Sequence, residues 1–228
     1  AREPGQRWLY SGGGYTVLQL LVEEVTQQSF SDYMETAILK PLGMEASSFD
    51  WDAIATSGRT DELATSFDDK LQSSPHRRYT ATAAASLYTT AQDMARFVQA
   101  YSQENSVLKQ ETLKQMMQPQ SGTDQNWGLG HILYVAAGAD EYVVGHDGGN
   151  LPALGHTVRV NPATGNGIAL LVSGNSGLAS QLGDDCDYWE TGKLSTNAKL
   201  RILGNRLVPA LVGIGLGILA IVIRALMK

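Results

Sequence analysis

Cysteine is nearly absent from this chain of 228 residues, and basic residues are few. Its single cysteine, Cys186, excludes an internal disulfide bond and a metal site built from several thiolates. The 17 lysines and arginines stand against 23 acidic residues, so the formal net charge is −6. An acidic chain without a basic stripe indicates that nucleic acid is not a partner. The hydrophobic share of 43% is typical of a folded globular protein rather than a disordered one.

Several motifs of well-known chemistry are missing as well. The chain has no Gly-x-Ser-x-Gly elbow, and no P-loop or dinucleotide-binding glycine pattern follows a strand and opens a helix. His131, His146 and His156 lack the spacing of metal ligands, so we expect no metal and no cofactor. No signal peptide is recognisable, and the first residues read as the middle of a folded domain.

Helical patterns dominate the first half of the chain, and strand patterns dominate the second. The expected helices follow the glycines at 12–14 and lie over 32–39, after Thr90, over 110–117 and over 177–190, and residues 45–85 are expected to be mostly loop. Thr90 with Asp93 resembles a capping box, and its helix is expected to bury Met94, Phe97, Val98 and Tyr101. The expected strands lie over 127–134, 141–145, 155–160 and 167–172. Because helices come first and strands follow without alternation, the order predicts an α+β fold with an antiparallel sheet.

The C-terminus carries a run of 17 residues without a charge, from Leu207 to Ile223. As a helix it would span roughly 25 Å, slightly less than the ~30 Å hydrocarbon core of a bilayer. Arg224 can extend toward the membrane surface, so we expect a transmembrane helix over 207–227. The polar and basic residues 191–206 are the expected linker to a main domain over 1–190. The alternative is a helix buried in a soluble domain.

Two places in the sequence could carry chemistry. Tyr10 precedes Ser11 and three glycines at the start of a helix, where a tyrosine could serve as a general base if nearby cations lowered its pKa. The alternative reading is a helix-entry turn with a packed aromatic ring. The second place is His146 to Asn150, an ionisable side chain and two glycines after an apolar strand. Its alternative reading is a tight surface turn.

Several segments match one known family in the right order. They are Glu3-Pro4-Gly5 before Tyr10-Ser11-Gly12, the stretch from Tyr15 to Pro41-Leu42-Gly43-Met44, the stretch from Ala85 to Phe97, and His146-Asp147-Gly148-Gly149-Asn150. Together they resemble the serine β-lactamase and penicillin-binding-protein family, in its branch of class C enzymes, esterases and D-peptidases. The resemblance covers about residues 1 to 180. It implies a β-lactamase/transpeptidase-like antiparallel sheet with helices, of which this chain holds the C-terminal portion.

The resemblance also implies acyl transfer, in which the serine of a Ser-x-x-Lys helix attacks an amide or ester carbonyl. Tyr10 is expected to move the proton of that serine toward the leaving group. His146 is expected to set the electrostatics of the site and to face a substrate carboxylate. The amide of Gly149 is expected to form half of the oxyanion hole. The residues expected to bind substrate are Ser11, Gly12, Asp147, Gly148 and Asn150.

Three departures from the family pattern matter. None of the nine residues before Tyr10 is a serine, and no later Ser-x-x-Lys takes its place in the right order. Gly12 stands where many relatives have Asn, and His146 stands where β-lactamases have Lys; these two changes favour an esterase or peptidase. Without the N-terminal strands of the family the sheet would have an open edge. We therefore expect a truncated, processed or split gene product, inactive by itself.

Two functions remain open at this point. The first is a serine hydrolase for an ester, a β-lactam or a D-amino-acid peptide, with an upstream segment that carries the nucleophile as its partner. The second is a non-catalytic, membrane-anchored protein that binds such ligands with a remnant of the fold. Family analogy places the main domain of a single-pass protein in the periplasm or outside the cell, although the basic residues before the run at 207–223 oppose this orientation.

Overall fold

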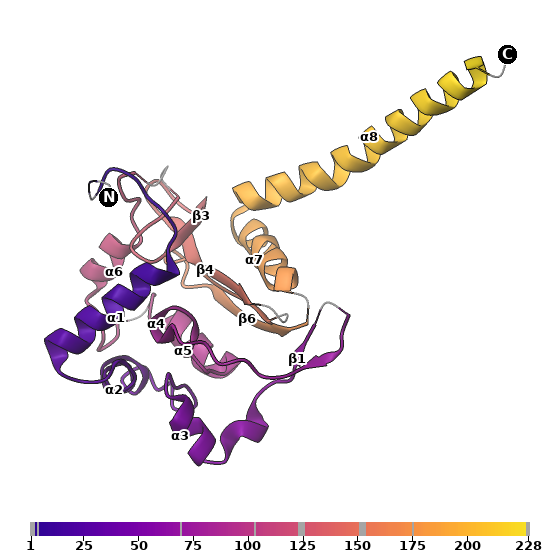
Figure 1. Ribbon diagram of the computed structural model, residues 1–228. Coiled ribbons are helices and arrows are strands. Elements are labelled where there is room, and N and C mark those ends of the chain that lie inside the picture. The colour runs from indigo at the N-terminus through magenta and orange to yellow at the C-terminus, as the bar shows by residue number, and fades with distance from the viewer. Residues whose placement is uncertain are drawn as a thin grey trace.

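The computed structural model describes residue 3 and residues 5–68, 70–102, 104–122, 126–150, 154–174 and 176–226. Helices of the first half lie on one side of a four-stranded sheet, and two helices follow the sheet (Figure 1). The helices are α1 (Gly12–Thr26), α2 (Phe30–Met34), the π-helical turn η1 (Glu35–Leu39), α3 (Trp51–Thr56), the 3-10 turn η2 (Arg59–Glu62), α4 (Thr82–Ala85), α5 (Ala91–Gln99), α6 (Gln110–Met116), α7 (Ser176–Thr191) and α8 (Thr196–Leu226). The order of elements confirms the predicted α+β class.

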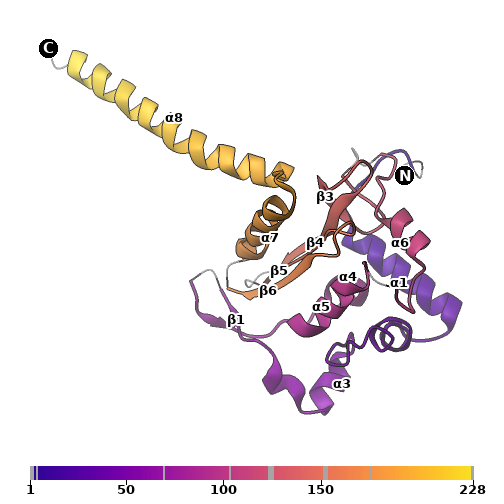
Figure 2. The ribbon, with the colours of Figure 1, turned by 180° about the vertical axis from the view of Figure 1, so that it is seen from behind.

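The sheet is antiparallel throughout, in the order β3 (Ile132–Ala136), β4 (Tyr142–Asn150), β5 (Leu154–Val160) and β6 (Gly167–Ser173). A separate small ribbon joins β1 (Ser66–Phe67) to β2 (Ser73–Ser74). Helix α7 packs on one face of the sheet and α5 on the other, as the two opposite views show (Figures 1 and 2). Within the described residues, β6 pairs with β5 alone, so its outer edge has no strand partner.

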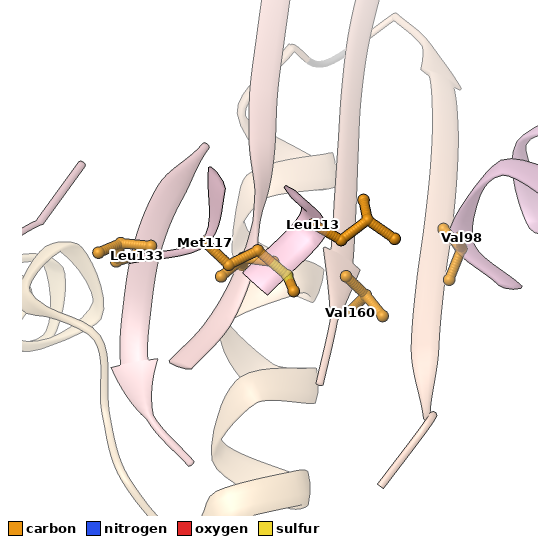
Figure 3. Close-up of a cluster of buried hydrophobic side chains, with 6 residues drawn as sticks. Val98, Leu113, Met117, Leu133 and Val160 are labelled. Atoms are coloured by element: carbon orange, nitrogen blue, oxygen red, sulfur yellow. The ribbon is translucent and has the colours of Figure 1, made fainter. Parts of the chain in front are cut away.

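The main apolar core lies between the sheet and the helices α5 and α6. Figure 3 shows Val98 and Leu113 of these helices directed at the strand residues Leu133 and Val160, with Met117 beside them. The first residues of α5 explain its position. The side chain of Thr90 accepts a hydrogen bond from the amide of Asp93, which is one of the two bonds of the predicted capping box. The carboxylate of Asp93 instead accepts hydrogen bonds from the amide of Ala46 and the hydroxyl of Ser47. Met94 and Val98 then fall on the buried face, as the helical spacing predicted.

The first part of the fold differs from the expectation in how little it buries. No residue of α1 is buried, and Val25 on its apolar face is 74% exposed. Residues 45–85 were expected to be mostly loop, and they hold only short elements, from α3 to α4. The apolar face of α1 therefore packs against little within the described residues.

Strand β4 is longer than predicted and changes the setting of His146. The expected strand ended at Gly145, whereas β4 continues to Asn150 because residues 144–150 pair in unbroken register with β5. His146 and the two glycines thus lie within a strand rather than in the turn after it. The expected strand over 127–134 is also shifted, since β3 begins at Ile132 and Trp127 makes only an isolated bridge to it.

The C-terminal helix α8 extends away from the rest of the chain (Figures 1 and 2). It begins at Thr196, so much of the expected linker 191–206 is helical. Among the described residues, no helix is long and apolar enough to span a membrane, and the transmembrane helix predicted over 207–227 is not supported. Residue 227 and many side chains of this range lie outside the described part of the chain.

Gly145 lies where three strands meet, and we expect Gly145→Ala to destabilise the fold. A Cβ atom there would lie 1.8 Å from the carbonyl oxygen of Val158, which is backbone and cannot swing away. We expect the free energy of unfolding to fall by about 3 kcal/mol or more, measured by urea unfolding. The control is Gly204→Ala in α8, where no atom lies within 4 Å and alanine should stabilise the helix by up to about 1 kcal/mol. If Gly145→Ala did not lower the free energy of unfolding relative to Gly204→Ala, this account of the packing would be wrong.

Candidate active site

The structure brings Tyr10 and His146 together from opposite ends of the domain. Tyr10 directly precedes Ser11, the residue that caps the N-terminus of α1, and His146 lies in the middle of β4. Their ring centroids are 6.1 Å apart, and Tyr10 is 60% exposed. A phenol and an imidazole, both partly accessible to solvent, therefore lie next to one another.

Two tryptophans hold this pair, and the sequence reasoning missed both. Trp8 and Trp127 stack with their centroids 4.6 Å apart. The ring of Trp127 lies 5.8 Å from that of Tyr10 and 5.7 Å from that of His146. Aromatic rings in such tilted arrangements add stabilisation beyond their buried area. The position of Trp8, two residues before Tyr10 in the same extended segment, was the available hint.

The residues directly after Tyr10 cap and begin helix α1. The Oγ atom of Ser11 accepts a hydrogen bond of 3.1 Å from the amide of Gly14. Gly12 is the first residue of α1, and a Cβ atom there would come no closer than 4.0 Å to Ala84. Packing therefore does not require glycine at position 12, and a larger side chain could be accommodated there.

The strand motif presents His146, Gly148 and Asn150 on one face of β4 and Asp147 and Gly149 on the other. The Nδ1 atom of His146 lies 2.5 Å from the backbone oxygen of Asp147. Because a carbonyl oxygen can only accept, Nδ1 carries the hydrogen, and Nε2 is the acceptor atom of the neutral ring. The backbone of the motif thus selects the tautomer of its own histidine.

Gly148 is required by the neighbouring strand. It pairs with His156 of β5, and a Cβ atom at Gly148 would lie 1.9 Å from the ring of His156. The same imidazole lines a cavity of about 340 Å³ whose wall also includes Asn150, Tyr88 and Leu171. The cavity therefore adjoins the strand motif directly, through Asn150 and His156.

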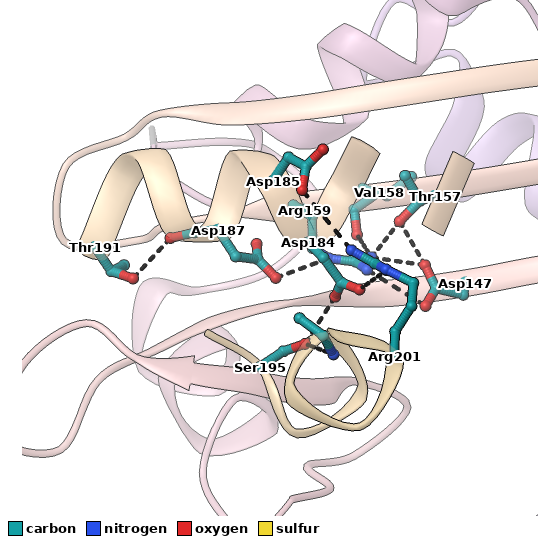
Figure 4. Close-up of polar contacts among 11 residues, drawn as sticks. Asp147, Thr157, Val158, Arg159, Asp184, Asp185, Asp187, Thr191, Ser195 and Arg201 are labelled. Atoms are coloured by element: carbon teal, nitrogen blue, oxygen red, sulfur yellow. Dashed lines mark hydrogen bonds and ion pairs between the residues drawn. The ribbon is translucent and has the colours of Figure 1, made fainter. Parts of the chain in front are cut away.

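Asp147 directs its carboxylate away from Tyr10 and His146, toward the face of the sheet that α7 covers (Figure 4). Its Oδ1 atom accepts hydrogen bonds from Thr157 at 2.6 Å and from Arg159 at 2.8 Å. The predicted contact of Asp147 with substrate would therefore have to come from its backbone. An arginine between two valines of β5 was the sequence feature that could have revealed this network.

The chain contains one Ser-x-x-Lys sequence, Ser106 to Lys109, which lies after Tyr10. Residues 106–108 form a bend, and Lys109 caps the N-terminus of α6, so the serine and the lysine do not share a helical turn. The amides of Val107 and Leu108 donate to the side chain of Asn105, which fixes this bend locally. Among the described residues, no group of three or more His, Cys, Asp or Glu residues could hold a metal ion.

A sequence model described as "Beta-lactamase" matches residues 1–192. The chain belongs to the beta-lactamase family. The resemblance stated from the sequence motifs is thereby confirmed.

Relatives of this beta-lactamase family member include both enzymes and penicillin-binding proteins. Protein flp of Staphylococcus aureus (strain N315) is 27% identical over 182 residues, a match that covers 76% of this chain and 35% of flp. The octameric penicillin-binding protein homologue from Pyrococcus abyssi has a TM-score of 0.66 at 24% identity, over 80% of this chain and 44% of that one. D-alanine carboxypeptidase AmpC from Burkholderia cenocepacia has a TM-score of 0.65 at 19% identity, over 84% and 62%. These structures confirm the predicted fold, and this chain spans only part of each relative.

Beneath the strand motif of this beta-lactamase family member, the pKa values of two neighbouring carboxyl groups shift in opposite directions. Burial disfavours ionisation of Asp147, but the hydrogen bond and the charge of Arg159 outweigh it and lower the pKa of this carboxyl. Burial raises the pKa of Asp187, on α7, to about 6, against the opposing effect of the same guanidinium. Arg159 therefore interacts with both carboxylates, and Asp187 is protonated before Asp147 as the pH falls.

This pKa of Asp187 predicts a loss of stability as the pH rises. The folded pKa of about 6 lies above the usual 3.8, so the stabilisation is complete below about pH 4 and is lost as the pH rises through about 6. Between pH 4 and 7, the free energy of unfolding of the wild type should fall relative to that of Asp187→Asn by on the order of 2–3 kcal/mol. Urea unfolding at several pH values measures both proteins. A difference that does not change with pH would show that Asp187 does not titrate in this range.

Proposed function

We propose that this chain is part of a serine hydrolase that acts by acyl transfer on an ester, a β-lactam or a D-amino-acid peptide. The observation that carries the proposal is the approach of the Tyr10 and His146 rings to 6.1 Å beside the glycines of β4. Membership of the beta-lactamase family supports it. Solved relatives of the same fold include a D-alanine carboxypeptidase.

In the proposed reaction, a serine from a segment other than residues 1–228 attacks the carbonyl carbon. The hydroxyl of Tyr10 passes the proton of this serine to the leaving group, as a general base and then a general acid. The imidazole of His146 lies beside this transfer and faces a substrate carboxylate, to which its Nε2 atom donates when the ring is protonated. The amide of Gly149 stabilises the developing oxyanion, a contribution on the order of 3 kcal/mol for each backbone donor.

The residues around this centre would shape the substrate site. Ser11 holds the start of α1, Gly12 leaves space beside Tyr10, and Gly148 and Asn150 form the wall on β4. The missing side chain at position 12 and the histidine at 146 favour esters or peptides over β-lactams. The alternative is a non-catalytic protein that binds such ligands with the same fold.

Labelling with acylating probes tests the proposal. A fluorescent fluorophosphonate and a fluorescent penicillin are applied to residues 1–228 and to a natural polypeptide that extends upstream to include a Ser-x-x-Lys. We expect the extended polypeptide alone to be labelled, and labelling to fall at least 10-fold in Tyr10→Phe, which lacks the proton-transfer group. Labelling of residues 1–228 would refute the external nucleophile. Two folded but unlabelled polypeptides would favour the binding protein.

Replacement of Gly12 tests the expected substrate preference. Because a side chain at position 12 meets open space, Gly12→Asn should change the free energy of unfolding by less than about 1 kcal/mol. The new amide can hydrogen-bond an acylamino substrate, so penicillin labelling of the extended polypeptide should rise relative to fluorophosphonate labelling. Gly12→Ala, which adds bulk without a hydrogen-bonding group, is the matched control. An equal ratio of the two labels in both variants would contradict this role of position 12.

A further inference from the structure

Arg159 is almost completely enclosed between the sheet and α7. Its side chain is 2% exposed, although a guanidinium is costly to bury without partners. The guanidinium carbon lies 3.4 Å from the ring centre of Tyr134 on β3, and the Nη1 atom donates to the backbone oxygen of Val158. The buried arginine therefore has an aromatic ring on one side. Figure 4 shows the hydrogen-bond acceptors around its edge.

The hydrogen bonds of Arg159 join separate elements through a single side chain. Its Nη1 and Nη2 atoms donate to the two carboxylate oxygens of Asp147 on β4, at 2.8 and 3.3 Å. Its Nε atom donates to Asp187 on α7 at 3.3 Å. Thr157 contacts both Arg159 and Asp147. A bidentate pair fixes orientation as well as distance, so the plane of the Asp147 carboxylate is held relative to α7.

Asp147 is the residue between His146 and Gly148, and it precedes Gly149 by two positions. Pairing with β5 sets the register of this stretch, and fixing the side chain of Asp147 adds a restraint from α7 on the two peptide groups on either side. The backbone oxygen of Asp147 also sets the tautomer of His146, at 2.5 Å. The hydrogen bonds of Arg159 on the α7 face of the sheet thus restrain the backbone that carries His146 and Gly149.

We propose that Arg159 and Asp187 are positioning residues for the strand segment His146 to Gly149. They hold it through the carboxylate of Asp147 and so set the direction of the Gly149 amide and of the His146 ring. Arg159 is enclosed and its donors are engaged, so it does not touch substrate. The catalytic part of this inference rests on the proposed serine hydrolase function, whereas the restraint of the backbone does not.

Kinetics of the upstream-extended polypeptide test the catalytic part. With a nitrophenyl ester as substrate, Arg159→Met should lower kcat at least 10-fold and leave KM within about 2-fold, because alignment is lost and binding is not. The matched control is Arg201→Met, which removes a 2.6 Å ion pair with Asp184 on the side of α7 that faces α8. Its kcat should stay within 2-fold of the wild type. An equal loss in the control, or a change confined to KM, would overturn the positioning role.

A second variant covers the case in which Arg159→Met does not fold. Asp187→Asn keeps the shape and one acceptor for the Nε atom but weakens the charge-assisted bond, so kcat should fall by about 3- to 10-fold. Unchanged kcat in a folded Asp187→Asn protein would remove Asp187 from the positioning network.

Hydrogen exchange separates failure of this inference from failure of the proposed function. If the wild type hydrolyses no ester, the hydrolase proposal fails, and amide exchange over residues 145–150 still measures the restraint. Exchange there should be at least 10-fold faster in Arg159→Met or Asp187→Asn than in the wild type, and unchanged in Arg201→Met. Equal exchange rates in all four proteins would overturn the inference.

Discussion

The pairing of β4 with β5 is the interaction on which the rest of this structure depends. Seven residue pairs, from Val144↔Val160 to Asn150↔Leu154, keep one register without a bulge. Because side chains alternate along a strand, this register sends His146 and Gly148 to one face and Asp147 to the other. A slip of one residue would exchange the two faces and place a carboxylate in the candidate active site. The glycines at 145 and 148 protect the register, since a larger residue at either would collide with β5.

The same register explains why a charged cluster can be tolerated under the sheet. Burying an arginine and two carboxylates has a large desolvation cost, which the ion pairs and hydrogen bonds offset only when the geometry is good. Here the guanidinium of Arg159 hydrogen-bonds both Asp147 and Asp187. The geometry is incomplete, because the buried Oδ1 atom of Asp187 has no hydrogen-bond partner. The cluster is therefore better suited to fixing the strand and α7 in one arrangement than to adding stability. Apolar packing between the sheet, α5 and α6 supplies the stability instead.

Sequence patterns predicted the parts of this fold that local chemistry determines. The capping of α5 by Thr90 and the buried face with Met94 and Val98 followed from spacing, and the family followed from ordered motifs. The end of β4 could not be read from the sequence, because two glycines resemble a turn until the partner strand is known. The roles of Trp127 and Arg159 depend on contacts between distant segments, which single-sequence patterns do not contain. The predicted transmembrane helix rested on the length of the charge-free run and on Arg224 after it, and the described helices do not support it.

The exposure of α1 has a consequence for how the candidate active site behaves over time. This helix buries no residue and is held chiefly by its contacts with α4 and α2. A helix of this length has little stability by itself in water. Local opening of this helix therefore costs less free energy than opening of the sheet, and Tyr10, which precedes the helix, then depends on Trp8 and Trp127 to stay beside His146. His146 thus lies in the paired strands of the sheet, whereas Tyr10 lies next to a helix that opens more readily.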